Sequence, residues 1–280
     1  RGAWQALLSR LSLSCGLEPL DSYMGGWCLY QIIACRLRGR ASLYQSGGAI
    51  GFRDQLQDAV NLILFDFAYA RERIIDCCKH QYTQGDVMHW WHVHPDGDMG
   101  IRTRCSDDLL WLCWAVCEYC EKTGDYAICG QTAPYIDSPA LKDGEGDRYE
   151  KAVPCAQASV IDHAIAALEC CMRRGLGEHG LPRFGSGDWN DALSEVGGES
   201  VWLGWFASSC AVGMARLCEH LGMSAHRYKK YGLKVAAAAE SAWSGRWYLR
   251  GYFPDGEALG GGDRIDSVAQ SWAILSDAHT

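Results

Sequence analysis

The chain has 280 residues, of which 48% are hydrophobic and 21% charged, a composition typical of a soluble globular protein with a large core. A formal net charge of −8, without any dense basic run, argues against a nucleic-acid-binding surface. No run of eighteen or more uncharged apolar residues occurs, so no membrane span is predicted in this segment.

The apolar residues recur mostly at helical spacing, which favours an all-α protein with one domain over residues 1–280. Residues 25–38 are nearly all apolar and predict a buried helix. Ser106 and Gly124 have the chemistry of a helix N-cap and a helix stop. The pattern predicts helices over residues 3–13, 25–38, about 55–68, 69–78, 109–121, 156–174, 199–221 and 224–243, with another beginning near residue 266.

Long polar loops separate these predicted helices, and residues 247–253 are the best strand candidate. Helices of about 12–20 residues with such loops suggest pairs of helices arranged as a barrel or toroid, because strand-length Val/Ile runs typical of a parallel sheet are absent. Three loops, 44–58, 81–108 and 181–191, each combine glycine, aromatic, arginine or amide, and carboxylate residues just before a helix. We expect them to converge at one rim and line a cleft.

Fifteen cysteines are unusual for a chain of this length. Most lie inside apolar helical patterns, which predicts small buried side chains in a reducing compartment rather than a disulfide framework. Cys117 and Cys120 form a C-x-x-C pair without a second pair, so zinc or redox chemistry is disfavoured.

The histidine-rich loop raises the question of a metal site. His92 and His94, with Asp96 or Asp98, have chelating chemistry. Nothing of fixed spacing completes the ligand set, however, so hydrogen-bonding or structural histidines beside a sugar are favoured, and no metal or cofactor is predicted.

The segment from Arg102 to Asp108 joins two arginines to two carboxylates at the start of the clearest helix. Arginine keeps neighbouring carboxylates ionised, and both groups bind vicinal hydroxyls. Aspartates in a first helical turn also interact with the helix dipole without any substrate. We therefore expect a structural role for Asp107 and a ligand-facing role for Asp108.

Residues 183–191, Arg-Phe-Gly-Ser-Gly-Asp-Trp-Asn-Asp, place two carboxylates, an indole and an amide within four residues. An indole offers a flat face to a pyranose ring, and a carboxyl group can protonate a glycosidic oxygen. The alternative is a polar loop in which Asp188 or Asn190 caps a turn. As a general acid, Asp188 or Asp191 would need a pKa raised to roughly 6–7, which low solvent access beside Trp189 would favour.

Together these motifs resemble the inverting β-glycoside phosphorylases of glycoside hydrolase family 94, which include a region of the cyclic β-1,2-glucan synthases. The synthase branch looks closest, on residues 198–206 and 89–92. The matching segments, in the family's order, are residues 44–49, 51–58, 85–92, 102–112, 187–191, 198–205 and 270–272.

The resemblance implies an (α/α)6 barrel and inverting phosphorolysis with inorganic phosphate as co-substrate. It implies that Asp191 is the general acid and that Trp189 holds the sugar beside the cleaved bond. It maps Arg102 and Asp108 to contacts with the same sugar, and places Arg53 and Asp54 near that subsite.

The resemblance also implies an amino-terminal β-sandwich and final barrel helices outside this segment, which lacks an initiator Met and looks cut from something longer. Part of the phosphate pocket would lie there as well. A homodimer and a cytoplasmic location, at the inner membrane if the parent is a glucan synthase, are further expectations.

Two other functions stay open at this point. An inverting hydrolase on the same barrel would need a second catalytic carboxylate, for which Asp54, Asp58 and Asp108 are candidates. A non-catalytic glucan-binding module, helping a synthase to measure chain length, would need no catalytic carboxylate.

Overall fold

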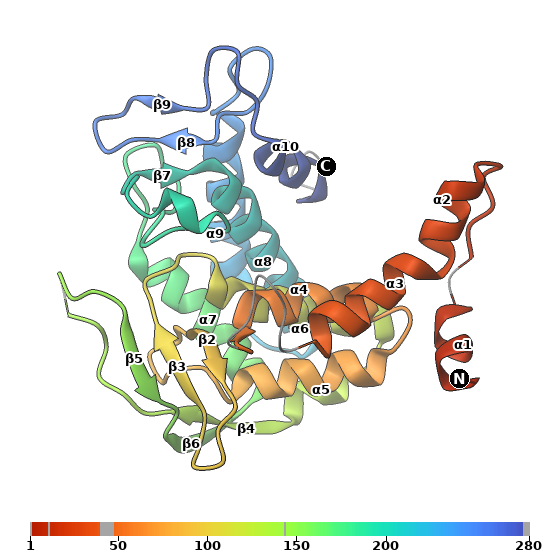
Figure 1. The fold of residues 1–280 in the computed structure, drawn as a ribbon. Coiled ribbons are helices and arrows are strands. Elements are labelled where there is room, and N and C mark those ends of the chain that lie inside the picture. Colours follow the sequence, from red (N-terminus) through yellow and green to blue (C-terminus); the bar gives the residue numbers. More distant parts are fainter. Residues whose placement is uncertain (1, 11, 40–47, 143, 277–280) are drawn as a thin grey trace.

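The computed structural model describes residues 2–10, 12–39, 48–142 and 144–276, and most of its regular structure is helical (Figure 1). Residues 44–47 of the first predicted loop lie outside this part of the chain. The α-helices are α1 (Gly2–Leu8), α2 (Glu18–Ser22), α3 (Cys28–Gln31), α4 (Phe52–Leu62), α5 (Phe67–Cys78), α6 (Asp108–Thr123), α7 (Val160–Arg174), α8 (Val201–His220), α9 (His226–Glu240) and α10 (Ser267–Leu275).

Helices α4 to α10 alternate between an inner and an outer layer. Each inner helix packs on the outer helix that follows it, α4 on α5, α6 on α7 and α8 on α9. The inner helices also pack on one another in the order α4, α6, α8 and α10. This alternation is the (α/α)6 barrel arrangement predicted from the sequence, built by hairpins of helices whose apolar faces cover each other.

Sequence explains which helices lie inside. Helix α8 has apolar residues all round, and its Trp202, Trp205 and Phe206 are fully buried. Helix α6 is buried along most of its length, whereas α5 and α9 each bury only one stripe. By length and composition α8 is the one helix of the described residues that meets the criteria for crossing a membrane, but 78% of its apolar window is buried inside the protein. Helix α8 is thus placed as a core helix.

Short strands lie in the loops between helices, a feature that the all-α prediction anticipated only at residues 247–253. They form antiparallel sheets in the orders β1-β2-β3-β5, β4-β6 and β7-β8-β9. The strands are β1 (Ile50–Gly51), β2 (Met88–His92), β3 (Met99–Arg102), β4 (Thr132–Ile136), β5 (Arg148–Lys151), β6 (Pro154–Ser159), β7 (Glu199–Ser200), β8 (Gly251–Tyr252) and β9 (Ala258–Leu259). Strand β8 falls within the predicted strand 247–253.

The prediction of one buried helix over 25–38 is wrong. Helix α3 lies between two π-helical segments, η1 (Tyr23–Trp27) and η2 (Ile32–Leu37), and Gly26 breaks the helical backbone. Leu29, Ile33 and Leu37 are buried in a small cluster, but Trp27 is 55% exposed. The segment belongs to an arm that projects from the body (Figure 1), so its apolar residues have few helices to pack against.

Two boundaries differ from the predictions for local reasons. Helix α6 begins at Asp108 with Asp107 at the N-cap, and the Ser106 hydroxyl instead donates a hydrogen bond to the carbonyl of Gly187, 3.0 Å away. Residues 156–159 belong to β6, and Ser159 with Asp162 forms the capping box that starts α7. Gly124 ends α6 in the left-handed conformation, as predicted.

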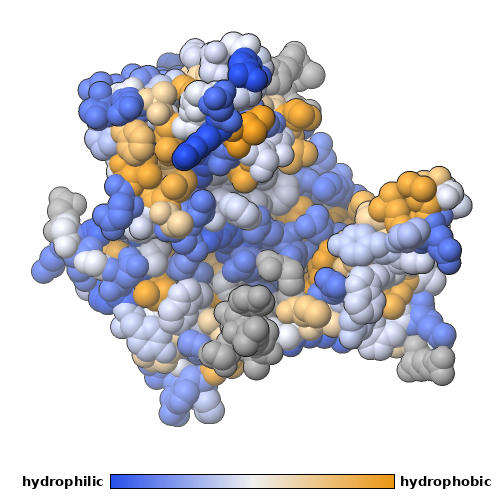
Figure 2. All heavy atoms as spheres, turned by 45° about the horizontal axis from the view of Figure 1, so that its top comes forward, coloured by the Kyte–Doolittle hydropathy of each residue, from blue (hydrophilic) through white to orange (hydrophobic). Residues whose placement is uncertain are grey.

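The described cysteines carry free thiols, and most of them are buried among apolar side chains, as the helical spacing predicted. Apolar side chains also gather on the projecting arm and on the upper lobe of the molecule (Figure 2). The surface between them is mainly hydrophilic (Figure 2).

Candidate active site

The three predicted loops meet at the amino-terminal ends of the inner helices, as far as their residues are described. Arg53 lies in the first turn of α4, Asp107 and Asp108 begin α6, and Asp188 and Asp191 lie in the loop that leads to α8. We call these five residues the rim cluster. Carboxylates are stabilised at such positions because the helix dipole places partial positive charge there.

Arg53 holds the rim cluster together. One guanidinium nitrogen, Nη1, lies 3.2 Å from Asp107 Oδ1 and donates to the carbonyl of Asp188 at 3.0 Å. The other, Nη2, lies 2.9 Å from Asp191 Oδ1. Burial by itself would lower the pKa of Arg53, but the negative charges of Asp107 and Asp108 outweigh it and raise the pKa. A single buried cation therefore links residues from all three loops.

Asp107 is a buried structural carboxylate. It is fully excluded from solvent and accepts a hydrogen bond from Trp111 Nε1 at 2.9 Å. Burial raises the pKa of Asp107 to about 6, against the lowering effect of Arg53. These contacts fit the structural role expected for Asp107.

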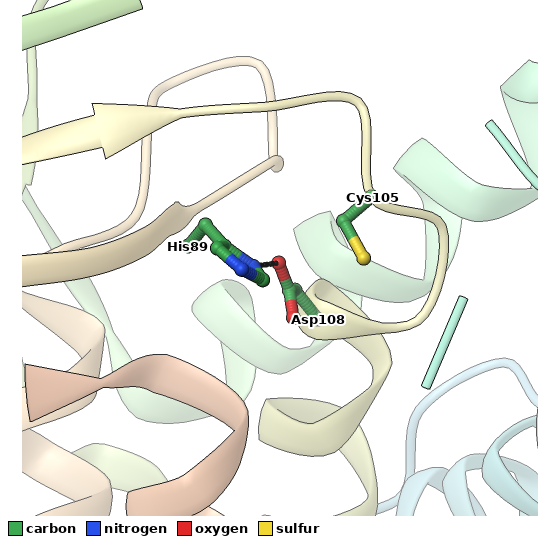
Figure 3. Close-up of side chains that lie close together, drawn as sticks. All are labelled: His89, Cys105 and Asp108. Atoms are coloured by element: carbon green, nitrogen blue, oxygen red, sulfur yellow. Dashed lines mark hydrogen bonds and ion pairs between the residues drawn. The ribbon is translucent and has the colours of Figure 1, made fainter. Parts of the chain in front are cut away.

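Asp108 is almost as buried and is paired with a histidine. Its Oδ2 atom lies 2.6 Å from His89 Nδ1, while Oδ1 accepts no hydrogen bond from the described residues (Figure 3). Burial alone would lower the pKa of His89, but the hydrogen bond and charge of Asp108 prevail and raise it to about 8. His89 is therefore largely protonated at neutral pH, so the pair is ionic.

His89, Cys105 and Asp108 also have the chemistry of a metal-binding trio, with ligand atoms within 4.8 Å of one another (Figure 3). The Arg53 guanidinium, however, lies 3.9 Å from both Cys105 Sγ and Asp108 Oδ1. Burial and the nearby carboxylates also raise the pKa of the Cys105 thiol, whereas a metal needs the thiolate. The positive charge that these acids require is thus supplied by arginine.

The two carboxylates of the loop 183–191 differ sharply. Asp188 is fully buried, and Arg250 Nη2 lies 2.6 Å from both of its carboxylate oxygens. Ser200, the N-cap of α8, donates to Asp188 Oδ2 at 2.8 Å. Asp191, by contrast, exposes 62% of its side chain. Its loop is fixed through Asp188 but leaves Asp191 open to solvent.

Trp189 and Asn190 lie between these two aspartates. Trp189 is 43% exposed, so its ring is available to a ligand but does not shield Asp191 from water among the described residues. Trp189 therefore does not provide the low solvent access that was expected beside the general acid. Asn190 accepts a hydrogen bond from the backbone of Ala192 at 3.1 Å. The turn-capping interpretation is thus correct for Asn190, alongside any role in binding.

Arg102 and Asp54 do not belong to the rim cluster. Arg102 is fully buried, donates to both oxygens of Asp86 at 2.7 Å, and stacks on Tyr82 at 3.7 Å. All its nitrogens are engaged by protein atoms, so the geometry does not bring Arg102 to a sugar beside Asp108. The Asp54 side chain lies against Gly51, since a Cβ added at Gly51 would lie 2.0 Å from Asp54 Oδ2. Both assignments remain predictions from the resemblance.

The histidines considered as metal ligands do not converge in the described residues. His92 packs edge-on against Trp90, and the exposed His94 accepts from the backbone of Asp96 at 3.2 Å. Sequence reasoning missed the partners His89 and Arg250. His89 lay within the same histidine run, and Arg250 lay in the predicted strand 247–253, but neither pairing had a local signal.

Comparison with known families and proteins gives a consistent result. Residues 3–280 match the family model described as Glycosyl hydrolase 94 superfamily, catalytic domain. Over 262 residues the chain is 39% identical to the cyclic beta-(1,2)-glucan synthase NdvB of Rhizobium meliloti (strain 1021), covering 89% of this chain and 9% of that protein. It is 28% identical to the solabiose phosphorylase of Paenibacillus borealis over 288 residues, covering 97% of this chain and 33% of the relative.

Solved structures share the fold at low sequence identity. A rhamnosidase from Klebsiella oxytoca with rhamnose bound has a TM-score of 0.51 at 16% identity, covering 82% of this chain and 38% of its own. An unsaturated glucuronyl hydrolase specific for heparin has a TM-score of 0.52 at 10% identity, and the match covers 82% of this chain and 58% of the hydrolase chain. These likenesses support the barrel of paired helices and carry no information on substrate.

Proposed function

The chain belongs to the glycosyl hydrolase 94 superfamily, and on that premise we propose that it processes β-linked glucosides by inverting phosphorolysis. Its relatives include phosphorylases and a β-1,2-glucan synthase. Because the chain spans 9% of that synthase and 33% of the solabiose phosphorylase, the substrates of the whole protein are part of the proposal.

One observation carries the proposal: a solvent-open carboxylate is held by a buried arginine beside an exposed indole. Asp191 lies 2.9 Å from Arg53 Nη2, and Trp189 stands two residues before it. The carboxyl of Asp191 can reach a glycosidic oxygen because it is not enclosed by protein. Trp189 offers the flat face on which a pyranose ring packs.

In the proposed reaction, the bound oligosaccharide takes the place of water around Asp191 and so supplies the low solvent access that a general acid needs. Asp191 then gives its proton to the glycosidic oxygen as the bond to the anomeric carbon breaks. Inorganic phosphate attacks that carbon from the opposite face, and α-glucose 1-phosphate forms with inversion. Phosphate is already anionic, so the protein need not supply the second carboxylate that an inverting hydrolase uses to deprotonate water. The reaction requires no resident cofactor.

Asp108 supports a sugar contact in this scheme. Its Oδ1 atom is buried without a hydrogen bond from the described residues, and such an unsatisfied acceptor costs about 1–3 kcal/mol. A sugar hydroxyl that reaches it would satisfy the acceptor. We propose this role for Asp108, with Arg53 acting by holding Asp191 and Asp107 in place.

An assay of the full-length protein with β-1,2- and β-1,4-glucooligosaccharides, with and without phosphate, tests the proposal. We expect α-glucose 1-phosphate only with phosphate. Asp191→Asn should reduce its formation by about a hundredfold to ten-thousandfold, because general acid catalysis typically contributes that much. Asp255→Asn, in an exposed turn, is the matched control and should keep full activity.

Two results would contradict phosphorolysis. Release of glucose without phosphate would indicate an inverting hydrolase. Binding of the oligosaccharide without turnover, unchanged in Asp191→Asn, would indicate a glucan-binding module that serves chain-length control within a synthase.

A further inference from the structure

A second cavity lies outside the rim cluster, between the carboxyl-terminal end of α7 and the loops that precede α6 and α8. Its volume is about 440 Å³, within the range of small-molecule sites. Five arginines line it, together with Asp86 and apolar residues such as Leu141, Pro182 and Leu203. We call it the arginine cavity; its arginines are Arg102, Arg104, Arg173, Arg174 and Arg183.

The positive charge of the arginine cavity is poorly balanced. Asp86 pairs with Arg102 at 2.7 Å, and no other cavity arginine forms an ion pair with a carboxylate in the described part of the chain. Three of them instead donate to neutral backbone carbonyls, Arg104 to Glu145, Arg173 to Gln84, and Arg174 to Cys105. A carbonyl satisfies the N–H groups but leaves the charge uncompensated.

This imbalance stands out in a chain with a net charge of −8, which has 34 acidic residues available for pairing. Several guanidinium groups around one cavity repel each other unless an anion joins them. Guanidinium forks match the oxygens of a phosphoryl group, which accepts several hydrogen bonds at once. The apolar part of the lining suits the carbon skeleton of a sugar.

We propose that the arginine cavity binds a phosphoryl anion, either free phosphate or the phosphoryl group of a sugar phosphate. The site is separate from the rim cluster, because Cys105 stands between the two. The carbonyl of Cys105 accepts from Arg174 at 2.9 Å, while its thiol donates to Asp107 Oδ1 at 3.3 Å. An anion in the cavity thus lies one residue away from the groups that position Asp191, without contacting them.

Isothermal titration calorimetry on the full-length protein at low ionic strength tests the proposal. The ligands are inorganic phosphate, α-glucose 1-phosphate, glucose and glucuronate. The test variant is Arg173→Gln with Arg183→Gln, both exposed positions of the cavity. The matched control, Arg246→Gln with Arg264→Gln, removes the same charge from exposed residues elsewhere.

Phosphorolysis also places a phosphoryl ligand at the catalytic centre, so the arginine cavity is recognised as a second site. We expect wild type and control to show this second site, and the test variant to bind there about tenfold or more weakly, since hydrogen bonds to charged groups are worth about 1.5–3 kcal/mol each. Tighter binding of α-glucose 1-phosphate than of phosphate identifies a sugar phosphate, and equal binding identifies the phosphoryl group alone. Should the double variant unfold by circular dichroism, the single Arg183→Gln substitution replaces it.

The same number of phosphoryl-binding sites with the same affinities in the test variant and wild type, or no binding of either phosphoryl ligand, would overturn the proposal. Tighter binding of glucuronate than of both phosphoryl ligands would do the same. The proposal does not depend on phosphorolysis, because only the difference between the test variant and its control reports on the arginine cavity, whereas phosphorolysis is tested by turnover at Asp191. The two proposals can therefore fail independently.

Discussion

The rim cluster, together with its neighbours Arg250 and Trp189, forms a closed base and an open mouth, and the two are built by opposite means. In the base, Asp107 and Asp188 are fully excluded from solvent and are matched by Arg53 and Arg250. In the mouth, Asp191 exposes most of its side chain and pairs with Arg53, and the neighbouring Trp189 is exposed as well. Burial with complete pairing fixes a position, whereas exposure leaves a group free to meet a substrate. Changes in the base should therefore alter stability, and changes in the mouth should alter chemistry.

The largest effect on stability is expected from Asp188→Asn. The substitution leaves the buried Arg250 paired with Asp266, which lies 3.3 Å from its Nε atom, and removing one partner of a buried ion pair costs about 3–5 kcal/mol. Asp191→Asn, in the same loop, should cost about 1 kcal/mol or less because that carboxylate is exposed. Urea unfolding of both variants measures the contrast, and similar losses would remove the distinction between base and mouth.

The second-largest loss of stability is expected from Gly185→Ala, at a point where the loop 183–191 passes close to residue 104. Gly185 has φ +64°, and an added Cβ would lie 2.1 Å from the carbonyl oxygen of Arg104. We expect a loss of about 2–4 kcal/mol from backbone strain and overpacking together. Gly124→Ala is the control, since φ is +70° there but no atom lies within 4 Å. A loss no larger than the control's would show that the loop can move away.

His89 makes the stability of the fold depend on pH, through its pair with Asp108. Its raised pKa means that the charged pair with Asp108 stabilises the fold fully below about pH 6.5 and is lost as pH rises through about 8. The change amounts to about 2 kcal/mol between those limits. Wild type and an exposed-site control, His94→Gln, should both lose this stability between pH 6.5 and 8.5 in urea unfolding. A His89→Gln variant with the same pH dependence as wild type would contradict the assignment.

The smallest effect on stability is expected from Trp189→Ala in the mouth. Because the ring is 43% exposed, stability should change by about 0.5 kcal/mol or less. The KM for a β-glucooligosaccharide should nevertheless rise roughly tenfold, because the stacking face is lost. Trp243→Ala, at a residue that is 50% exposed, should leave KM unchanged. An unchanged KM in Trp189→Ala would exclude the platform role.

The sequence by itself determined the plan of paired helices, a helix over residues 199–221 that the structure places in the core as α8, and the meeting of three motif-bearing loops. These follow from patterns that are local along the chain, namely helical spacing and the residues that begin and end helices. Motif order was enough to indicate the family, and 3–280 is the range that the family model matches.

Tertiary structure alone decided which of the similar charged residues do what. Asp188 and Asp191 look alike in sequence, and only Arg250, 62 residues beyond Asp188, makes one a buried anchor. Arg102 is close in sequence to the predicted site, yet its contacts with Asp86 and Tyr82 place it at the arginine cavity. Which cation compensates a given carboxylate depends on contacts between distant segments, and no spacing within a single helix or loop encodes them.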